Sequence, residues 1–241
     1  MLKVKDLTVR RGERCVLENI SLTLSKGRTV AVIGESGAGK STLVGAILGL
    51  LPVQNGHVSW NGGDLRSVFP SLVMQEPRAA FNPAFSLGRS VMEPVKARGL
   101  ILSDGRIDRL CNGLELDPAL LKRRPYEVSI GQAQRLGILR ALIAEAPLVL
   151  FDEPLSALDA VTQKLTAKLI ATLQREEGFA ALVVTHDLGY AAAHADDIVI
   201  LKKGRIEETA PAGQFFRAPQ TEYGRALCDA AFALGALERV A

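Results

Sequence analysis

A glycine-rich loop lies between an apolar run and a helix-forming run near the start of the chain. Residues 31–42 read AVIGESGAGKST and match the pattern G-x-x-x-x-G-K-[ST]. Glycines allow consecutive backbone N–H groups to point at one anion, and a helix beginning near Lys40 adds its positive dipole end. The segment therefore predicts a strand–loop–helix unit that binds phosphate groups. Its candidate ligands are Gly34, Glu35, Ser36, Gly37, Ala38, Gly39, Lys40, Ser41 and Thr42.

A second apolar run, residues 148–151, ends in two acids, Asp152 and Glu153. Beside a triphosphate, Lys40 is expected to reach the β- and γ-phosphates and Ser41 to hold Mg²⁺. Asp152 then suits a Mg²⁺ ligand acting through water, and Glu153 suits the group that polarises an attacking water. On its own, an apolar run before two acids is as typical of a solvated strand end. The interpretation therefore depends on the glycine-rich loop.

Short apolar runs alternate with longer helix-forming stretches. Four runs are predicted as buried strands: residues 29–33, 72–74, 148–151 and 181–185. Each precedes polar or glycine-bearing residues and then a helix, which is the pattern of an α/β protein with a largely parallel sheet. Because ligands bind outside the carboxyl ends of such strands, we expect the chemistry at that edge.

The first part of the chain has a different pattern. Residues 2–9 and 15–24 predict antiparallel strands joined by a turn at Arg11 and Gly12, and residues 58–63 predict a strand running into a hairpin turn.

The middle and the end of the chain predict helices. Residues 88–122 are expected to be mostly helical, with Ser103 as the N-cap of a helix through Leu114. A last helix is predicted over residues 223–237. With no repeat, low-complexity tract or Pro-rich linker in view, we expect one compact chain of subdomains.

Composition excludes several classes of protein. Lys and Arg total 29 against 26 Asp and Glu, and this charge of +3 is too small and too evenly spread to favour nucleic acid as the main partner. The apolar runs fall short of the ~20 residues of a membrane helix, and residues 1–6 lack a signal core. Cys15, Cys111 and Cys228 stand apart, which fits a reducing compartment. We expect a cytoplasmic protein.

Four further motifs follow the loop in a set order: VMQEP at 73–77, VSIGQAQR at 128–135, SALD at 156–159 and VVTHD at 183–187. Together with the loop and the acidic pair, they resemble the ATP-binding cassette (ABC) family of transporter ATPases over about residues 2–209. The resemblance implies ATP and Mg²⁺ as cofactors. It also implies a dimer of two cassettes that encloses two ATP molecules.

The resemblance implies a fold and a domain organisation. The fold is α/β, with an ABC-type P-loop NTPase core, an N-terminal antiparallel β subdomain and an inserted α-helical subdomain at about residues 77–125. A helical tail at about residues 210–241 completes a single ABC ATPase domain over residues 1–241.

The resemblance also implies roles toward the chain's own nucleotide. Gln75 senses the γ-phosphate and binds Mg²⁺ together with Ser41 and Asp152. Glu153 is the catalytic carboxylate, and His186 hydrogen-bonds the γ-phosphate. The other interpretation of His186 is an ordinary histidine at a strand end.

Another group of residues is implied to act at the partner's nucleotide. Ser129, Gly131 and Gln132 belong to the signature motif, and Asp159 bridges the dimer seam. Ser129 is also the predicted N-cap of a helix running to about Ala144, so a helix N-terminus faces a second anion.

That signature departs from its usual form, Leu-Ser-Gly-Gly-Gln, because Ile130 stands where a glycine allows close approach of two backbones. We expect the composite site that uses it to be weakened. A second departure is at the adenine platform, where no aromatic residue precedes Trp60. Arg10 or Arg11 is expected to stack there instead, with weak purine selectivity. His57 and His194 lack a partner at ligand spacing and are expected to be structural or exposed.

Two segments outside these motifs, residues 75–83 and 218–227, resemble the peptide and nickel importer branch. The alternative is that both are solvated loop and tail. The resemblance implies a nickel or small-peptide importer, most similar to the short nickel import ATP-binding subunits. Another alternative is an accessory ATPase of a phosphonate-cleaving (C-P lyase) complex.

The importer interpretation implies a second ABC ATPase subunit, two transmembrane permease subunits and an extracytoplasmic substrate-binding protein as partners, with no nucleic acid. The chain is then peripheral on the cytoplasmic face of the inner membrane. Arg78, Phe81 and Phe85 are candidate permease contacts, although core packing explains either phenylalanine equally well.

Overall fold

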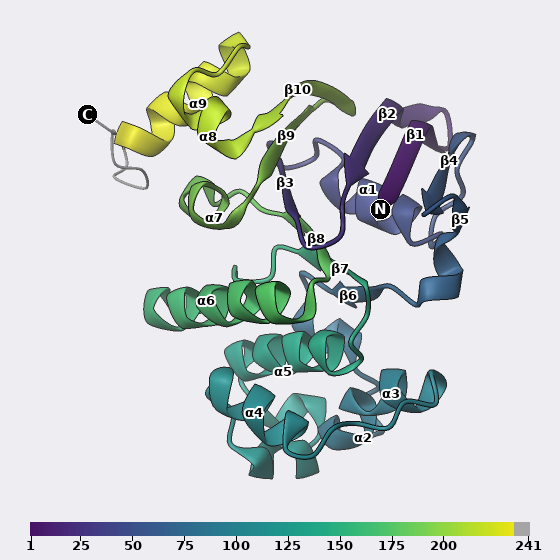
Figure 1. The fold of residues 1–241 in the computed structure, drawn as a ribbon, viewed down its shortest axis with the longest axis vertical. Helices are drawn as coiled ribbons and strands as arrows, with labels where there is room; N and C mark the ends of the chain where they lie inside the picture. Colours follow the sequence, from purple (N-terminus) through teal and green to yellow (C-terminus); the bar gives the residue numbers. More distant parts are fainter. Residues whose placement is uncertain (234–241) are drawn as a thin grey trace. The chain divides into compact units, whose positions relative to one another are not determined.

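The computed structural model describes residues 1–233 (Figure 1). Two compact units are present: a first unit made of residues 1–68 and the chain from 180 onward, and a second unit made of residues 69–179. Each unit contributes candidate site residues.

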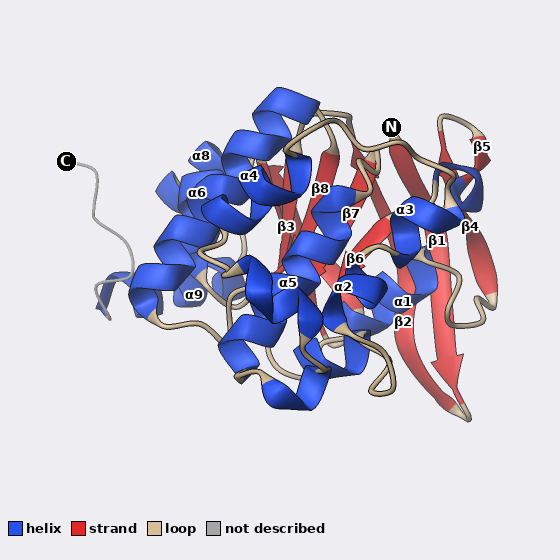
Figure 2. Cartoon of the chain, turned by 90° about the horizontal axis from the view of Figure 1, so that it is seen from below, coloured by secondary structure: helices blue, strands red, loops and turns tan. Residues whose placement is uncertain are grey.

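An antiparallel sheet opens the first unit. Its order is β2-β1-β4-β5, as Figure 2 shows for the neighbouring red strands β1, β2 and β4. The bounds are β1 Leu2–Arg11, β2 Arg14–Leu24, β4 Asn55–Trp60 and β5 Gly63–Asp64. Along β1 buried and exposed residues nearly alternate, as expected when one face of an antiparallel sheet is covered. The predicted hairpins are confirmed, with the first turn at residues 12–13.

The other strands of the first unit lie in the order β10-β9-β3-β8. Their bounds are β3 Thr29–Ile33, β8 Ala180–Val184, β9 Asp197–Lys202 and β10 Arg205–Pro211. β3 pairs in parallel with both β8 and β9, and β9 pairs antiparallel with β10. Every residue of β3 and of β8 is buried, which explains their uninterrupted apolar sequences.

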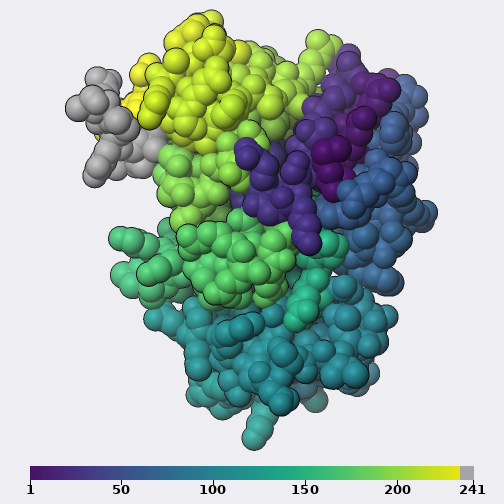
Figure 3. Space-filling model, in the orientation of Figure 1, coloured from purple at the N-terminus to yellow at the C-terminus, as the bar shows by residue number. Residues whose placement is uncertain are grey.

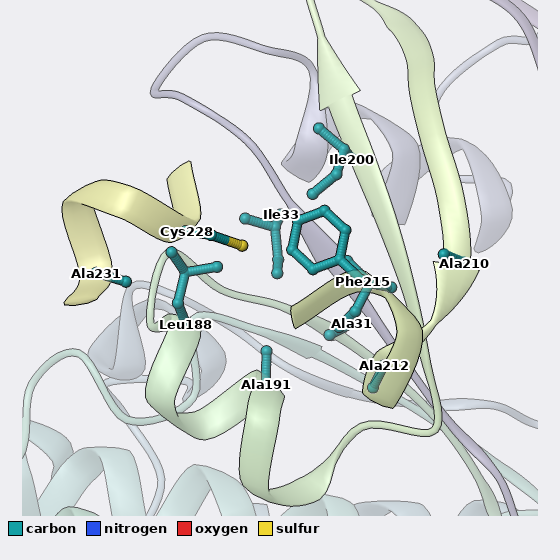
Figure 4. Close-up of a cluster of buried hydrophobic side chains, with 11 residues drawn as sticks. Ala31, Ile33, Leu188, Ala191, Ile200, Ala210, Ala212, Phe215, Cys228 and Ala231 are labelled. Carbon is teal, nitrogen blue, oxygen red and sulfur yellow. The ribbon is translucent and has the colours of Figure 1, made fainter. Parts of the chain in front are cut away.

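Four helices complete the described part of the first unit: α1 Lys40–Ile47, α7 Leu188–His194, α8 Ala212–Arg217 and α9 Glu222–Ala233. Figure 4 shows the buried cluster that α7, α8 and α9 form with the sheet, in which Phe215 of α8 and the sulfur of Cys228 of α9 lie against Ile33 of β3. Figure 3 shows α8 and α9 as one continuous yellow surface. The predicted last helix is confirmed as far as residue 233, and residues 234–237 of that prediction lie outside the described part.

The second unit contains a parallel strand pair and five α-helices within residues 69–179. The strands are β6 Ser71–Val73 and β7 Leu148–Asp152. The helices are α2 Leu87–Val91, α3 Glu93–Ala97, α4 Arg106–Gly113, α5 Ile130–Ile143 and α6 Ala160–Glu177. All four predicted buried strands are therefore present, within one residue at each end.

The predicted helical stretch over residues 88–122 is broken into short pieces. The N-cap prediction for Ser103 is wrong: α4 begins at Arg106 with Gly105, at φ 71°, as its N-cap. Ser103 contributes its backbone carbonyl, which accepts a hydrogen bond from Arg106 N at 3.2 Å. The positive φ of Gly105 makes a turn before the helix, so the helix starts later than a serine cap predicts.

Two further expectations concern membranes and cysteines. Within residues 1–233, the helices are too short or too polar to span a bilayer. Cys15 is exposed, Cys111 and Cys228 are buried, and all three are free thiols, as predicted. Burial raises the pKa of Cys228 to about 11, which keeps this core thiol protonated.

Candidate nucleotide-binding site

The glycine-rich loop lies between β3 and α1, as predicted. Gly34 directly follows β3 and lies close to the backbone of the neighbouring strand β9. A Cβ at this position would lie 2.1 Å from Leu201 O. Gly39, the N-cap of α1, has φ 108°, and a Cβ there would lie 2.7 Å from Leu17 Cδ2. Both positions therefore require glycine. Since Gly39 has no side chain, the first N–H groups of α1 are not capped by their own N-cap residue.

The lysine of the loop is held in place by the loop itself. Lys40 is buried, and its Nζ donates to Gly34 O at 2.7 Å and to Glu35 O at 3.0 Å. Ser41, next to it, is exposed. An ammonium group already oriented by two carbonyls loses little freedom when a phosphate joins it.

His186 lies at the same sheet edge as the loop. β3 and β8 are parallel with Val32 opposite Val184, and both the loop and His186 follow the ends of these strands. The turn around His186 is fixed on both sides because Asp187 N donates to Thr185 Oγ1 and the Asp187 carboxylate caps α7. The imidazole is exposed, so it is accessible to a ligand bound at this edge.

A pocket of about 310 Å³ opens beside the loop. It is lined by Arg14, Cys15 and Val16 of β2, by residues 35–38 of the loop, and by residues 202–204 at the end of β9 and in the turn to β10. Arg14, Lys202 and Lys203 outnumber the single acid, Glu35, which favours an anionic ligand.

The stacking prediction for Arg10 and Arg11 does not match this pocket, since neither residue is among those that line it. Arg10 instead donates to Glu13 O within its own turn at 2.5 Å.

In the second unit, Gln75 and the acidic pair also share one sheet edge. β6 and β7 are parallel with Val73 opposite Phe151, so Gln75 and Glu153 each lie two residues past this pair. Asp152 ends β7 and is only 9% exposed. Glu153 has φ 49°, a conformation uncommon for a residue with a side chain, and Ser156 Oγ donates to its carbonyl at 3.0 Å. The backbone of the turn after β7 is thus fixed at Glu153.

The signature motif begins α5, as predicted. Ser129 Oγ accepts from Gln132 N at 3.1 Å, while Gln132 Oε1 accepts from Ser129 N at 2.9 Å. This reciprocal arrangement is a capping box, which stabilises the helix start. Ile130 beside it is 55% exposed.

The turn that contains Asp159 lies next to the signature motif, since a Cβ on Gly131 would be 3.6 Å from Ala157 O. Asp159 caps α6 by accepting from Val161 N and Thr162 N. Hydrogen bonds from Thr162 hold the pKa of Asp159 below its ordinary value. The structure therefore brings together Ser129, Gly131, Gln132 and Asp159 in the second unit.

Sequence reasoning missed the internal role of two arginines. Arg78, a candidate permease contact, donates instead to Val128 O at 2.7 Å, and Arg140 of α5 donates to Ala80 O at 2.6 Å. Phe81 is buried in the core at 4% exposure, while Phe85 lies under the guanidinium of Arg89. The segment after Gln75 is thus attached to the chain just before α5 and to the last turn of α5.

The other two histidines do not lie at the sheet edges that carry the candidate site residues. As predicted, one is exposed and the other has a structural contact. His57 is exposed on β4, and the ring of His194 packs on Tyr190 with their centroids 5.0 Å apart.

Comparison with known proteins identifies this arrangement. Residues 17–156 match the ABC transporter family. The chain is 35% identical over 240 residues to the nickel import ATP-binding protein NikD of Brucella abortus, covering 94% of this chain and 91% of the relative. It is 34% identical to the oligopeptide transport ATP-binding protein OppF of Escherichia coli, covering 89% and 68%.

A longer relative, the peptidoglycan transport ATP-binding protein YejF of Agrobacterium fabrum, is 37% identical over 92% of this chain, which spans only 43% of that relative. Among solved structures, a dimeric ATP-binding cassette in a post-hydrolysis state with ADP and Pi superposes with a TM-score of 0.78 at 30% identity. The match covers 88% of this chain and 99% of that one. The chain therefore belongs to the ABC transporter family and is an ATP-binding, ATP-hydrolysing protein of its peptide and nickel import branch.

Proposed function

We propose that this chain powers the uptake of nickel or small peptides through partner permease subunits. The observation that carries the proposal is the glycine-rich loop, with Lys40 oriented by two loop carbonyls at the start of a helix whose N-cap has no side chain. The choice of cargo follows relatives named for nickel import and for oligopeptide transport.

The loop residues 34–42 are proposed to bind the triphosphate. Their N–H groups and Lys40 compensate the phosphate charge, and Ser41 supplies a hydroxyl to Mg²⁺. Gln75 and Asp152 add an amide and a carboxylate oxygen, so the proposed donor set consists of the hard oxygen ligands that Mg²⁺ prefers. When bound, the ion supplies positive charge to the β- and γ-phosphates.

Hydrolysis needs an oriented water and little covalent chemistry from the protein. We assign Glu153 to accept a proton from the attacking water, because it stands on the fixed turn after β7, at the sheet edge that also carries Gln75. His186 donates a hydrogen bond to the γ-phosphate, and Gln75 responds to its presence or loss. These roles make Glu153, His186 and Gln75 the proposed catalytic group.

Ser129, Gly131, Gln132 and Asp159 are proposed to act toward the nucleotide of a second cassette. A relative of known structure is a dimer, which supports pairing of two such chains. Two permease subunits and an extracytoplasmic binding protein complete the proposed importer. The chain is then held at the cytoplasmic face of the inner membrane by its permeases, in a single ABC ATPase domain that includes the helical insertion and the C-terminal tail.

Copurification and transport test this proposal. The tagged chain is extracted in detergent with its neighbours and reconstituted in vesicles with the binding protein and labelled nickel or peptide. We expect ATP-dependent accumulation of one cargo, abolished by Glu153→Gln. Recovery with soluble enzyme subunits in place of permeases would contradict the importer and favour the phosphonate-cleaving complex. The metal or peptide content of the binding protein identifies the cargo.

A further inference from the structure

A buried acid organises the start of the C-terminal helix. Glu208 on β10 is 7% exposed, and its carboxylate accepts hydrogen bonds from Gln220 N at 2.8 Å, Thr221 N at 3.0 Å and Thr221 Oγ1 at 2.7 Å. A Cβ on Gly224 would lie 2.6 Å from Glu208 Oε2, so the helix approaches the carboxylate too closely for another residue. The segment 220–224 is therefore wrapped around one charge.

The segment is also attached to the strand that leads to the glycine-rich loop. Cys228 and Ala231 of α9 belong to the same buried cluster as Ala31 and Ile33 of β3 (Figure 4). Tyr223 packs against that cluster. Apolar contacts and the polar contacts of the preceding residues thus both hold the segment that carries Tyr223.

Tyr223 contacts a lysine that lines the pocket beside the loop. The Nζ of Lys202 is 4.4 Å from the centroid of the Tyr223 ring, a cation–π contact. Burial, and next the negative charge of Glu35, raise the pKa of Tyr223. Glu35 and Lys202 both line the pocket of about 310 Å³.

These contacts connect to the phosphate-binding lysine. Glu35 O accepts from Lys40 Nζ at 3.0 Å, and Gly204 N, two residues after Lys202, donates to Ala38 O at 3.0 Å. The Tyr223 ring holds the Lys202 ammonium at the pocket wall, where it attracts an anionic ligand. A change at Tyr223 therefore reaches the pocket through Lys202.

We propose that Tyr223 is a positioning residue for nucleotide binding, holding Lys202 at the wall of the loop pocket. The C-terminal segment is then part of the nucleotide site. This inference rests on the proposed assignment of residues 34–42 as the triphosphate site. Tyr223 acts through Lys202 and is not assigned a contact with ATP.

The test is a double-mutant cycle on the affinity of the full chain for Mg-ATP, measured by calorimetry. We expect Tyr223→Leu and Lys202→Met each to raise Kd about five-fold, and the double variant no further, because both remove one contact. Tyr223→Phe keeps the ring over Lys202 and is expected to restore most of the affinity. Glu222→Ala, an exposed neighbour on α9, is the matched control and leaves Kd unchanged.

Additive effects, or an unchanged Kd in both single variants, would overturn the inference. A merely structural role lowers the melting temperature without coupling the two Kd changes, so each variant is also melted without nucleotide. Should Tyr223→Leu not fold, Tyr223→Phe and Lys202→Met form a second cycle. If the ring alone acts, Lys202→Met must raise Kd for Mg-ATP by the same factor in the wild type and in Tyr223→Phe. Lys40→Ala separates the two proposals: if it binds ATP like the wild type, the site assignment itself fails.

Discussion

The N-cap of helix α1 in the first unit is Gly39, whereas the N-cap of helix α5 in the second unit is Ser129. Both helices follow a motif that is proposed to bind the phosphates of a nucleotide. At α1 the N-cap has no side chain, and the nearest cation is held by loop carbonyls. At α5 the serine and Gln132 satisfy each other in a capping box.

The two helix N-termini therefore depend on a ligand to different degrees for the stabilisation of their N–H groups. The first N–H groups of α1 donate no hydrogen bond to a side chain of their N-cap residue, so an anion adds stabilisation there directly. At α5 the same stabilisation is already supplied by the chain, and a nucleotide must share or replace those bonds. Substitutions at the start of α1 should therefore alter the affinity of the isolated chain for ATP. Substitutions at the start of α5 should alter the stability of the chain and ATP hydrolysis by the assembled pair.

The largest expected effect is on the α1 side. Lys40→Ala removes the charge that faces the phosphates, and we expect Kd for Mg-ATP to rise by about 10²–10³-fold. Calorimetry on the purified chain measures it. Lys26→Ala, at an exposed lysine before β3, is the control and keeps wild-type affinity. Retained affinity in Lys40→Ala would show that the α1 end is not the phosphate site.

Glu153→Gln distinguishes hydrolysis of ATP from its binding at the two helix N-termini. The amide keeps the shape of the side chain but cannot accept the proton, so we expect kcat to fall by about 10²-fold or more while ATP still binds and closed dimers accumulate. Steady-state hydrolysis and size-exclusion chromatography with ATP measure these effects. Glu115→Gln is a matched control, because Glu115 is exposed and has a similar φ of 50°. Wild-type turnover in Glu153→Gln would remove Glu153 from its assigned role.

A structural feature of this chain could be predicted from the sequence where neighbouring residues determine it. β3 and β8 are predicted within one residue because their burial on both faces produces uninterrupted apolar runs. The Ser129 cap is equally local. The start of α4 is missed because the left-handed turn at Gly105 resembles a simple helix continuation in sequence. Tyr223 is missed because Lys202 reaches it only through the fold, and no short-range spacing connects them.

Ile130→Gly sharpens the comparison at α5. The exposed branched side chain occupies the position where glycine allows two backbones to approach, so we expect its removal to raise turnover of the assembled complex about two- to five-fold. The gain is limited because glycine weakens the start of the helix. Ile101→Gly, at a residue 98% exposed outside the motifs, is the control for a loss of surface isoleucine. Unchanged turnover in Ile130→Gly would show that this site is not weakened by its isoleucine.

The smallest expected effect is at the capping box. Ser129→Ala removes the hydroxyl that accepts from Gln132 N, and we expect the free energy of unfolding to fall by about 1 kcal/mol. Denaturant unfolding of the chain alone measures it. Because Ser129 is assigned to the partner's nucleotide, Kd for ATP in the isolated chain should stay at its wild-type value, unlike in Lys40→Ala.

Ser86→Ala gives the matched comparison for that last variant. Ser86 is the N-cap of α2 and accepts from Arg89 N at 3.3 Å, so its loss removes the same kind of bond outside the motifs. Both alanine variants should lose similar stability, but only Ser129→Ala should slow hydrolysis by the assembled pair. If the two variants slow it equally, the effect is one of stability and the α5 end has no part in the nucleotide site. If only Ser129→Ala does so, the capping hydroxyl serves the helix in the free chain and the nucleotide in the dimer.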